Sequence, residues 1–177
     1  MKVELLAHPG DKEWLEVKER ALVTVGKRAV NPPTDEWKKS ILRARHSPIR
    51  HLQFSFYIEC PYWVSVHLCR HVHAQPYVKS QRNDRQSDYD RNSARQDEQV
   101  SMIWDMNAEE LITIANKRLC HQASEETRNL VKIMCDEVLK LNPEFEQELV
   151  PNCIRDGGCH EMYPCGHNND MKKIYGG

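Results

Sequence analysis

A stretch of alternating side chains in the first half of the chain constrains the fold most strongly. Residues 52–59 read LQFSFYIE, with an apolar side chain at every second position. Because successive side chains of a strand point to opposite faces, this pattern predicts a half-buried strand over 52–59. Cys60-Pro61 ends it, and Pro61 suits the first turn of a helix that we expect from Tyr62 to about His71. That helix would have one aromatic and cationic face, formed by Trp63, His67, Arg70 and His71. Such a face suits a planar ligand that carries phosphate.

Periodicity elsewhere predicts mostly helices. Thr34 and Asn107 are suited to cap two of them, and Asn142-Pro143 to stop another. We expect a strand at 3–7 and helices at 11–23, 35–45, 107–122 and 125–141. These elements predict an α/β (α+β) fold, in which a small mixed or antiparallel sheet is flanked by helices. We expect one domain over 1–150, followed by a Cys/His-rich tail over 151–177.

Composition excludes several classes of partner. The 177 residues carry a formal net charge of −1, so no general basic field is available and no nucleic acid is expected as a partner. No stretch approaches the roughly 20 apolar residues that span a bilayer, so we expect no membrane association and a cytoplasmic location. The seven cysteines are an odd number, and without a secretory signal they favour thiols or metal ligands over a disulfide framework.

Two separated motifs carry a resemblance to a known family. Arg70-His71-Val72 is followed by seven residues, then Ser80, with Arg82 two positions further on. The segment resembles the Arg-His-Arg, seven residues, Ser signature of the flavin-dependent thymidylate synthases, and Ser47-Pro48-x-x-His51 resembles the turn that precedes it. A second match, in the right order, comprises Asn116-Lys117-Arg118 and Ala123-x-x-Glu126-x-Arg128. Together these motifs cover about residues 46–140.

The resemblance implies a fold and a reaction. The fold would be thymidylate synthase-complementing-protein-like, and the protein a flavin-dependent methyltransferase. FAD, reduced by NADPH, would methylate deoxyuridylate at C5 with methylenetetrahydrofolate as carbon donor, so the cofactor would carry the chemistry. Such enzymes are homotetramers with active sites between subunits. No cysteine nucleophile is required, and none lies within 70–82.

The resemblance also assigns roles to individual positions. His71 alone would be read as a structural histidine and Arg118 as a partner in a surface salt bridge, but the matched spacing favours ligand contacts for both. Trp63 is interpreted as a core residue. The expected cofactor contacts are Ser47, Arg70, His71, His73 and Asn116. The expected contacts to a pyrimidine nucleoside monophosphate are His67, Lys79, Ser80, Gln81, Arg82 and Arg118.

Several positions depart from the family pattern. Val72 replaces the second Arg of the signature, His67 stands where a Gln is usual, and Tyr77-Val78 replaces Asn-Glu. Val78 cannot accept a hydrogen bond, so recognition of the pyrimidine or its sugar can differ. Two alternatives therefore stay open: one-carbon transfer to another pyrimidine nucleotide, or a non-catalytic nucleotide-binding scaffold with a metal-organised tail.

The polar segment 81–101 interleaves arginines with aspartates and cannot build a core. It is interpreted either as a solvated loop or as a lid whose arginines meet phosphate. The family carries a longer insert here, so Arg91 or Arg95 would have to supply its phosphate contact. The alternating charges are Arg82, Asp84, Arg85, Asp88, Asp90, Arg91, Arg95 and Asp97.

The tail concentrates three cysteines and two histidines in 15 residues. Thiolate and neutral imidazole are ligands that zinc prefers, and glycines near them permit the turns that a wrapped ion needs. One hypothesis is a zinc site made by Cys153, Cys159, Cys165 and His167, with His160 as the alternative to His167. A plain reduced tail, or a disulfide or redox role, are the other interpretations.

Overall fold

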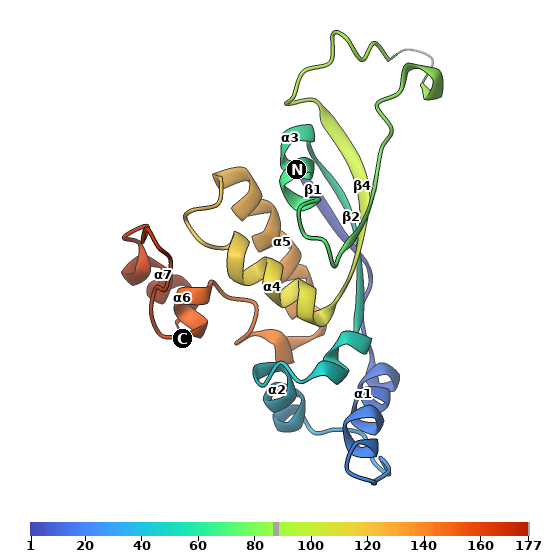
Figure 1. The fold of residues 1–177 in the computed structure, drawn as a ribbon, viewed down its shortest axis with the longest axis vertical. Helices are drawn as coiled ribbons and strands as arrows, with labels where there is room; N and C mark the ends of the chain where they lie inside the picture. The colour runs from blue at the N-terminus through green and yellow to red at the C-terminus, as the bar shows by residue number, and fades with distance from the viewer. Residues whose placement is uncertain (87–88, 177) are drawn as a thin grey trace.

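The computed structural model describes residues 1–86 and 89–176. Its centre is one four-stranded sheet in the order β1-β2-β4-β3, with every neighbouring pair antiparallel (Figure 1). The α+β class is confirmed, and the sheet is antiparallel rather than mixed. The strands are β1 (Lys2–Ala7), β2 (Gln53–Pro61), β3 (Gln75–Val78) and β4 (Gln99–Asn107).

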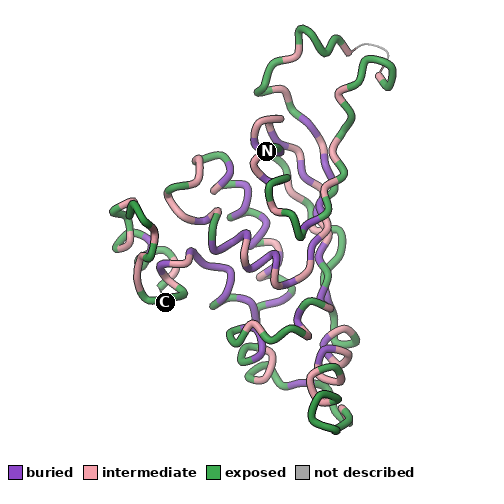
Figure 2. Tube along the Cα trace, viewed as in Figure 1, coloured by how far each residue is buried: buried purple, intermediate pink, exposed green. Residues whose placement is uncertain are grey.

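Strand β2 confirms the alternation read from the sequence. Phe54, Phe56, Ile58 and Cys60 are buried, and the residues between them are not. Helices α4 and α5 lie against this buried face of the sheet (Figure 1). The core forms there, as the buried segments in Figure 2 show.

Helices α2, α4 and α5 begin where a side chain accepts a hydrogen bond from a free backbone amide. Thr34 Oγ1 accepts from Trp37 N at 3.3 Å, and Asn107 Oδ1 accepts from Glu110 N at 3.0 Å, so both predicted caps are confirmed. The α-helices are α1 (Asp11–Val23), α2 (Asp35–Arg43), α3 (Tyr62–Leu68), α4 (Ala108–Arg118), α5 (Glu125–Leu141), α6 (Asn152–Arg155) and α7 (Asn168–Tyr175). Short 3-10 turns are η1 (Ser47–His51), η2 (Asn83–Arg85) and η3 (Pro143–Phe145).

Helix α3 is shorter than the sequence predicted. It ends at Leu68, and His71 N donates to Leu68 O at 3.0 Å in a tight turn. A second turn, from Ala74 N to His71 O at 3.1 Å, leads the chain into β3. The prediction that Arg70 and His71 share a helical face with Trp63 is therefore wrong. Helix α4 likewise ends at Arg118, before the predicted 122.

Strands β3 and β4 were not predicted. Strand β4 begins at Gln99, inside the segment read as a loop, and alternates like β2, with Val100, Met102, Trp104 and Met106 buried. Between β3 and β4 the chain extends beyond the sheet as an arm, at the top of Figure 1. Asp88, one of the alternating charges of this arm, lies outside the described residues.

Two hydrogen bonds clasp the beginning of the chain to residues 142–144. Trp14 Nε1 donates to Glu144 Oε1 at 2.7 Å, and Asn142 Nδ2 donates to Pro9 O at 3.0 Å. Phe145 fills the space behind them, with its ring centroid 5.5 Å from that of Phe54. The clasp therefore closes the lower end of the core. Among the described residues, no helix is both long enough and apolar enough to cross a membrane.

Candidate functional site

A row of three neighbouring side chains, Arg118, His71 and Glu110, forms the centre of the candidate site. Arg118 Nε donates to His71 Nε2 at 2.9 Å, and His71 Nδ1 lies 3.3 Å from Glu110 Oε1. Because a guanidinium can only donate, Nε2 must accept. The ring proton is therefore on Nδ1, facing the Glu110 carboxylate.

Burial sets the charges of this row. It lowers the pKa of His71 to about 4, with smaller contributions from Arg118 and Arg70. Burial likewise raises the pKa of Glu110 and lowers the pKa of Arg118. His71 is thus a neutral imidazole near pH 7, and its ring packs edge-on against Trp104 with centroids 6.2 Å apart.

The row is positioned by helix α4 and by the turn after α3. Glu110 and Arg118 lie eight residues apart on α4, so they face the same side of the helix. Arg118 also reaches back to α3, where its Nη2 donates to His67 O at 3.4 Å. His71 is therefore held between two partners on one rigid element, and α3 is tied to that element too.

Two pockets meet at this row. One, of about 270 Å³, is lined by His71 and Arg118 together with Lys117. The other, of about 520 Å³, is lined by Glu110 and by the cationic or titratable side chains of Arg45, Arg50 and His73. His71 lines the first pocket and Glu110 the second, so the 3.3 Å contact between these two side chains links the pockets. Together they form a surface rich in cationic groups, which also carries the carboxylates of Glu161 and Glu109.

Ser47 and Arg70 flank this surface. Ser47 is exposed at the start of η1, and Arg70 is exposed in the turn after α3. Within residues 1–86 and 89–176, the Arg70 side chain makes no hydrogen bond or ion pair. Its guanidinium is therefore free to meet an anion.

Asn116 is placed differently from the cofactor contact that was expected. Its side chain is buried, and its amide nitrogen donates to Glu148 O at 2.9 Å and to Val150 O at 2.6 Å. Its amide oxygen accepts from Arg45 and Arg155 at 2.5 and 3.2 Å. Both amide hydrogens are thus used within the protein, and a cofactor contact by Asn116 would require one of these bonds to break.

The arm keeps the remaining predicted substrate residues apart from the row. Arg82 is exposed and paired with Asp84 at 2.6 Å, and Arg82 N donates to Ser80 Oγ at 3.4 Å. Arg82 lines a separate pocket made only of arm residues. Within one chain, the structure brings together His67, His71 and Arg118, and leaves Lys79, Ser80, Gln81 and Arg82 on the arm.

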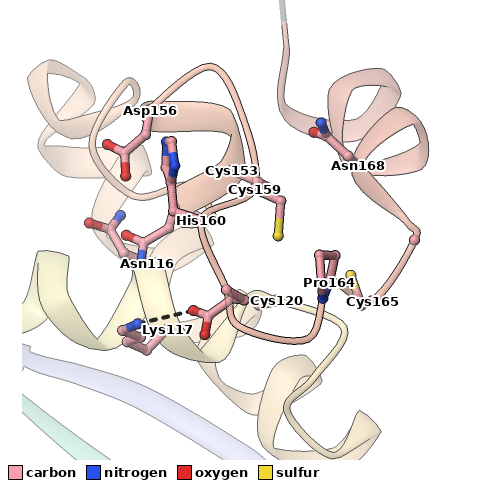
Figure 3. A pocket seen from close by; sticks show the side chains of 13 residues that line it. Asn116, Lys117, Cys120, Cys153, Asp156, Cys159, His160, Pro164, Cys165 and Asn168 are labelled. Atoms are coloured by element: carbon pink, nitrogen blue, oxygen red, sulfur yellow. Dashed lines mark hydrogen bonds and ion pairs between the residues drawn. The ribbon is translucent and has the colours of Figure 1, made fainter.

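The predicted metal ligands are only partly gathered. Cys153, Cys159 and Cys165 line one pocket of about 200 Å³, with His160 at its wall (Figure 3). His167 instead stacks on His121 with centroids 4.2 Å apart, and its Nδ1 lies 3.1 Å from Asp170. Within residues 1–86 and 89–176, no three His, Cys, Asp or Glu side chains are closely enough arranged to hold a metal ion.

Comparison with known proteins supports the predicted family resemblance. The model of the family Thymidylate synthase complementing protein matches residues 95–144, which hold β4, α4 and α5. A flavin-dependent thymidylate synthase of Clostridium tetani is 37% identical over 78 residues, which are 44% of this chain and 31% of that protein. The chain is similar to the flavin-dependent thymidylate synthases. The resemblance predicted from the two motifs is confirmed, although the chain spans only about a third of the length of this relative.

A solved structure shares the fold. It is the UMP/dUMP methylase PolB from Streptomyces cacaoi bound with 5-Br dUMP. The match has a TM-score of 0.64 and 15% identity, and covers 81% of this chain and 92% of that one. At this identity the likeness concerns the fold, and it agrees with the antiparallel sheet and its helices.

Sequence reasoning missed Glu110 as a site residue. It was interpreted only as part of the Asn107 capping box, in which its side chain would return to the start of the helix. The structure uses the backbone amide of Glu110 for the cap and turns the buried carboxylate toward His71. The sequence does contain a signal for this role, because Glu110 lies among the apolar residues Ala108, Leu111 and Ile112. Such a position predicts burial of the carboxylate, and a buried charge requires a partner.

Proposed function

We propose that the protein methylates deoxyuridylate at C5 in a flavin-dependent reaction, with methylenetetrahydrofolate as carbon donor and NADPH as reductant. The observation that carries this proposal is the contact between His71 and Arg118. They come from the two separate motifs of the resemblance and meet at 2.9 Å. If either motif matched the family by chance, the two motifs would have no reason to lie side by side in the structure.

The residues around the row are chemically suited to FAD. A flavin with its pyrophosphate needs cationic groups and hydrogen-bond donors. Arg45 and His73 supply donors in the pocket at Glu110, and the exposed Arg70 lies close enough to His71 to lower the pKa of that histidine. Arg70, His71, His73 and Ser47 would hold the cofactor, which supplies hydride transfer when bound. The protein's own contribution is to hold His71 neutral and to keep its Nδ1 proton directed at Glu110.

We propose that Arg118 and the arm residues Ser80 and Arg82 bind the nucleotide, with His67, Lys79 and Gln81 around them. The guanidinium of Arg82 is only paired with an exposed Asp84, so phosphate can displace that carboxylate at little cost. Because Arg82 lines a pocket made only of arm residues, the complete site would take the arm from a second copy. Active sites between subunits follow from this division, and the resemblance implies that the assembly is a homotetramer.

The uncovered face of the sheet supports such an assembly. Tyr77 and Ile103 lie opposite each other on β3 and β4, and 59% and 39% of their surfaces are exposed. Strand β3 is at the edge of the sheet, and contact with another chain would cover an exposed apolar pair beside that edge. We therefore place the subunit contact on the face opposite α4 and α5.

A second candidate is one-carbon transfer to a different pyrimidine nucleotide. Val72, in place of an arginine, is 81% exposed and makes no polar contact that could replace it. The loss of one cation beside Arg70 and the replacement at Val78 would alter recognition of the base or sugar rather than the cofactor. This candidate shares the FAD site and differs only in the nucleotide.

Reconstitution with FAD tests the shared part of both candidates. We expect flavin absorbance to remain with the protein after gel filtration, and His71→Ala to weaken FAD binding by about 10-fold or more. His8→Ala is the matched control, because this histidine contacts only Pro9 and lies outside the row. If wild-type protein retains no flavin, both candidates are wrong.

A nucleotide panel then separates the candidates. Protein with FAD, NADPH and methylenetetrahydrofolate would be incubated with each pyrimidine nucleoside monophosphate, and the methylated product measured by mass spectrometry. Product from deoxyuridylate supports the first candidate, and product only from another nucleotide supports the second. Flavin binding without any methylated product would favour the non-catalytic scaffold.

A further inference from the structure

We propose that Cys120, Cys153, Cys159 and Cys165 form a four-thiolate site for one zinc ion, which fastens the tail to the end of helix α4. The site differs from the one predicted from the tail alone, because Cys120 takes the place of a histidine. It does not depend on the proposed reaction.

The four cysteines come together in space from distant parts of the chain. All four line the pocket of about 200 Å³ between the end of α4 and the tail. Figure 3 shows the thiols of Cys159 and Cys165 directed into the space between the tail loop and α7. Cys120, 33 residues before the tail cysteines begin, approaches this pocket from the body of the protein.

The pocket brings four thiols from two parts of the chain to one place. A divalent cation bound there would stabilise all four as thiolates.

The local backbone is shaped to present these side chains. Cys153 lies in the first turn of α6, and Cys159 follows a turn in which Gly157 has φ of +74°. Cys165 precedes Gly166, which has φ of +80°. Two left-handed glycines therefore reverse the chain next to the second and third tail cysteines, as a segment wrapped around an ion requires.

The tail has little else to order it. Within residues 152–176, the only buried hydrophobic side chains are those of Cys153 and Met171, while Met162, Tyr163 and Ile174 are exposed. So little apolar burial does not offset the entropy of fixing some 25 residues. A metal bound only in the folded state would supply the missing stability, because its binding free energy adds to that of folding.

Zinc is the ion that best suits the donors. Four thiolates are a typical set for structural zinc, which takes a closed tetrahedral geometry. The described thiols do not yet converge on one centre, so binding requires their side chains to rotate inward and to release their protons. His167 is committed to His121 and Asp170 and does not line the pocket.

Metal analysis of matched variants tests the proposal. Full-length protein, purified under reducing conditions without chelator, should contain about one zinc ion per chain. Cys120→Ser should bind added Zn²⁺ at least about 100-fold more weakly, since even changes in the outer shell of a site cost 10- to 100-fold. His167→Ala and Cys69→Ser should bind zinc like wild type, because neither residue lines the pocket of the four cysteines.

Cobalt substitution keeps the test decisive if Cys120→Ser does not fold. Wild-type protein loaded with Co²⁺ should show the visible bands of tetrahedral cobalt and thiolate charge-transfer intensity for four sulfur ligands. Loss of the bands in His167→Ala would overturn the proposal in favour of a three-cysteine, one-histidine site. A wild-type protein that neither contains nor binds zinc, or that links these cysteines as disulfides in a non-reducing peptide map, would also overturn it.

Discussion

Arg118 and His71 are joined by a 2.9 Å hydrogen bond that fixes the tautomer of the imidazole. The arginine accepts no proton, so His71 must present its bare Nε2 to Arg118 and its Nδ1 proton to Glu110. Protonation of His71 would place a cation directly against the guanidinium. The hydrogen bond between Arg118 and His71 therefore forms only while the imidazole is neutral.

The first prediction concerns stability against pH. The pKa of His71 is about 4 in the folded protein and near 6.5 when unfolded, so the unfolded chain takes up the extra proton first as the pH falls. The free energy of unfolding should decline from about pH 6.5 to about pH 4, by on the order of 1 kcal/mol for each pH unit. Urea unfolding at several pH values measures this slope.

His71→Gln is the comparison for that slope, because glutamine does not titrate. The variant should be less stable than wild type at pH 7 but should lose less stability between pH 6.5 and pH 4. Equal slopes for the two proteins would show that the histidine is not held neutral by its surroundings.

The second prediction concerns the partner of His71. Glu110→Gln replaces a buried acceptor by an amide that can turn a donor toward the imidazole, and should lower the free energy of unfolding by about 1–3 kcal/mol. Glu109→Gln, its neighbour on the surface, loses only an exposed ion pair with Arg50 and should cost less than about 1 kcal/mol. Chemical denaturation of both variants at pH 7 makes the comparison.

The third prediction concerns nucleotide binding by the arm. Arg82→Ala should weaken binding of the preferred pyrimidine monophosphate by on the order of 1.5–3 kcal/mol, because a charge-assisted bond to phosphate is lost. Arg28→Ala removes another exposed arginine that is paired with a carboxylate, Glu19, and that lines none of the pockets of the candidate site, and should leave the affinity unchanged. Calorimetric titration gives both dissociation constants, and an unchanged value for Arg82→Ala would remove the arm from the site.

The fourth prediction concerns Asn116. Asn116→Ala leaves two buried carbonyls and two arginines without their partner, and should lower the free energy of unfolding by about 2–4 kcal/mol. Asn92→Ala, on the exposed arm, should change it by less than about 0.5 kcal/mol. A small effect of Asn116→Ala, combined with a large loss of FAD affinity, would restore the cofactor role expected from the motif.

The sequence predicted those elements whose pattern is local. Strand β2 follows from alternation, helix α1 from helical spacing, and helix α5 from helical spacing together with its stop at Asn142-Pro143. Strand β4 carries the same alternation as β2, but the charged residues before Gln99 led to its interpretation as part of a loop. Strand β3 has only four residues, and its existence depends on pairing with β4, which no local pattern reveals.

The sequence predicted those residues of the candidate site that belong to a motif. It did not predict which side chains these residues contact, because the contacts depend on how the chain packs. His71 and Arg118 follow from the resemblance, but their mutual contact depends on the turn after Leu68, which shortens the predicted helix. Glu110 and Cys120 were not predicted as site residues, because each acquires its neighbours only through the tertiary fold. Asn116 was predicted as a cofactor contact, but its amide nitrogen donates to carbonyls of the segment 148–150, a pairing that only the tertiary fold creates.

The clasp between the two ends of the core bears on how the protein is synthesised. Trp14 meets Glu144 across 130 positions, and Pro9 meets Asn142 across 133. A ribosome must release the chain beyond Phe145 before helix α1 can reach its final place, so most of the molecule waits in a partly assembled state. During that interval the apolar faces of α1 and β2 lie open, and slowing translation near residue 145 should increase their capture by chaperones.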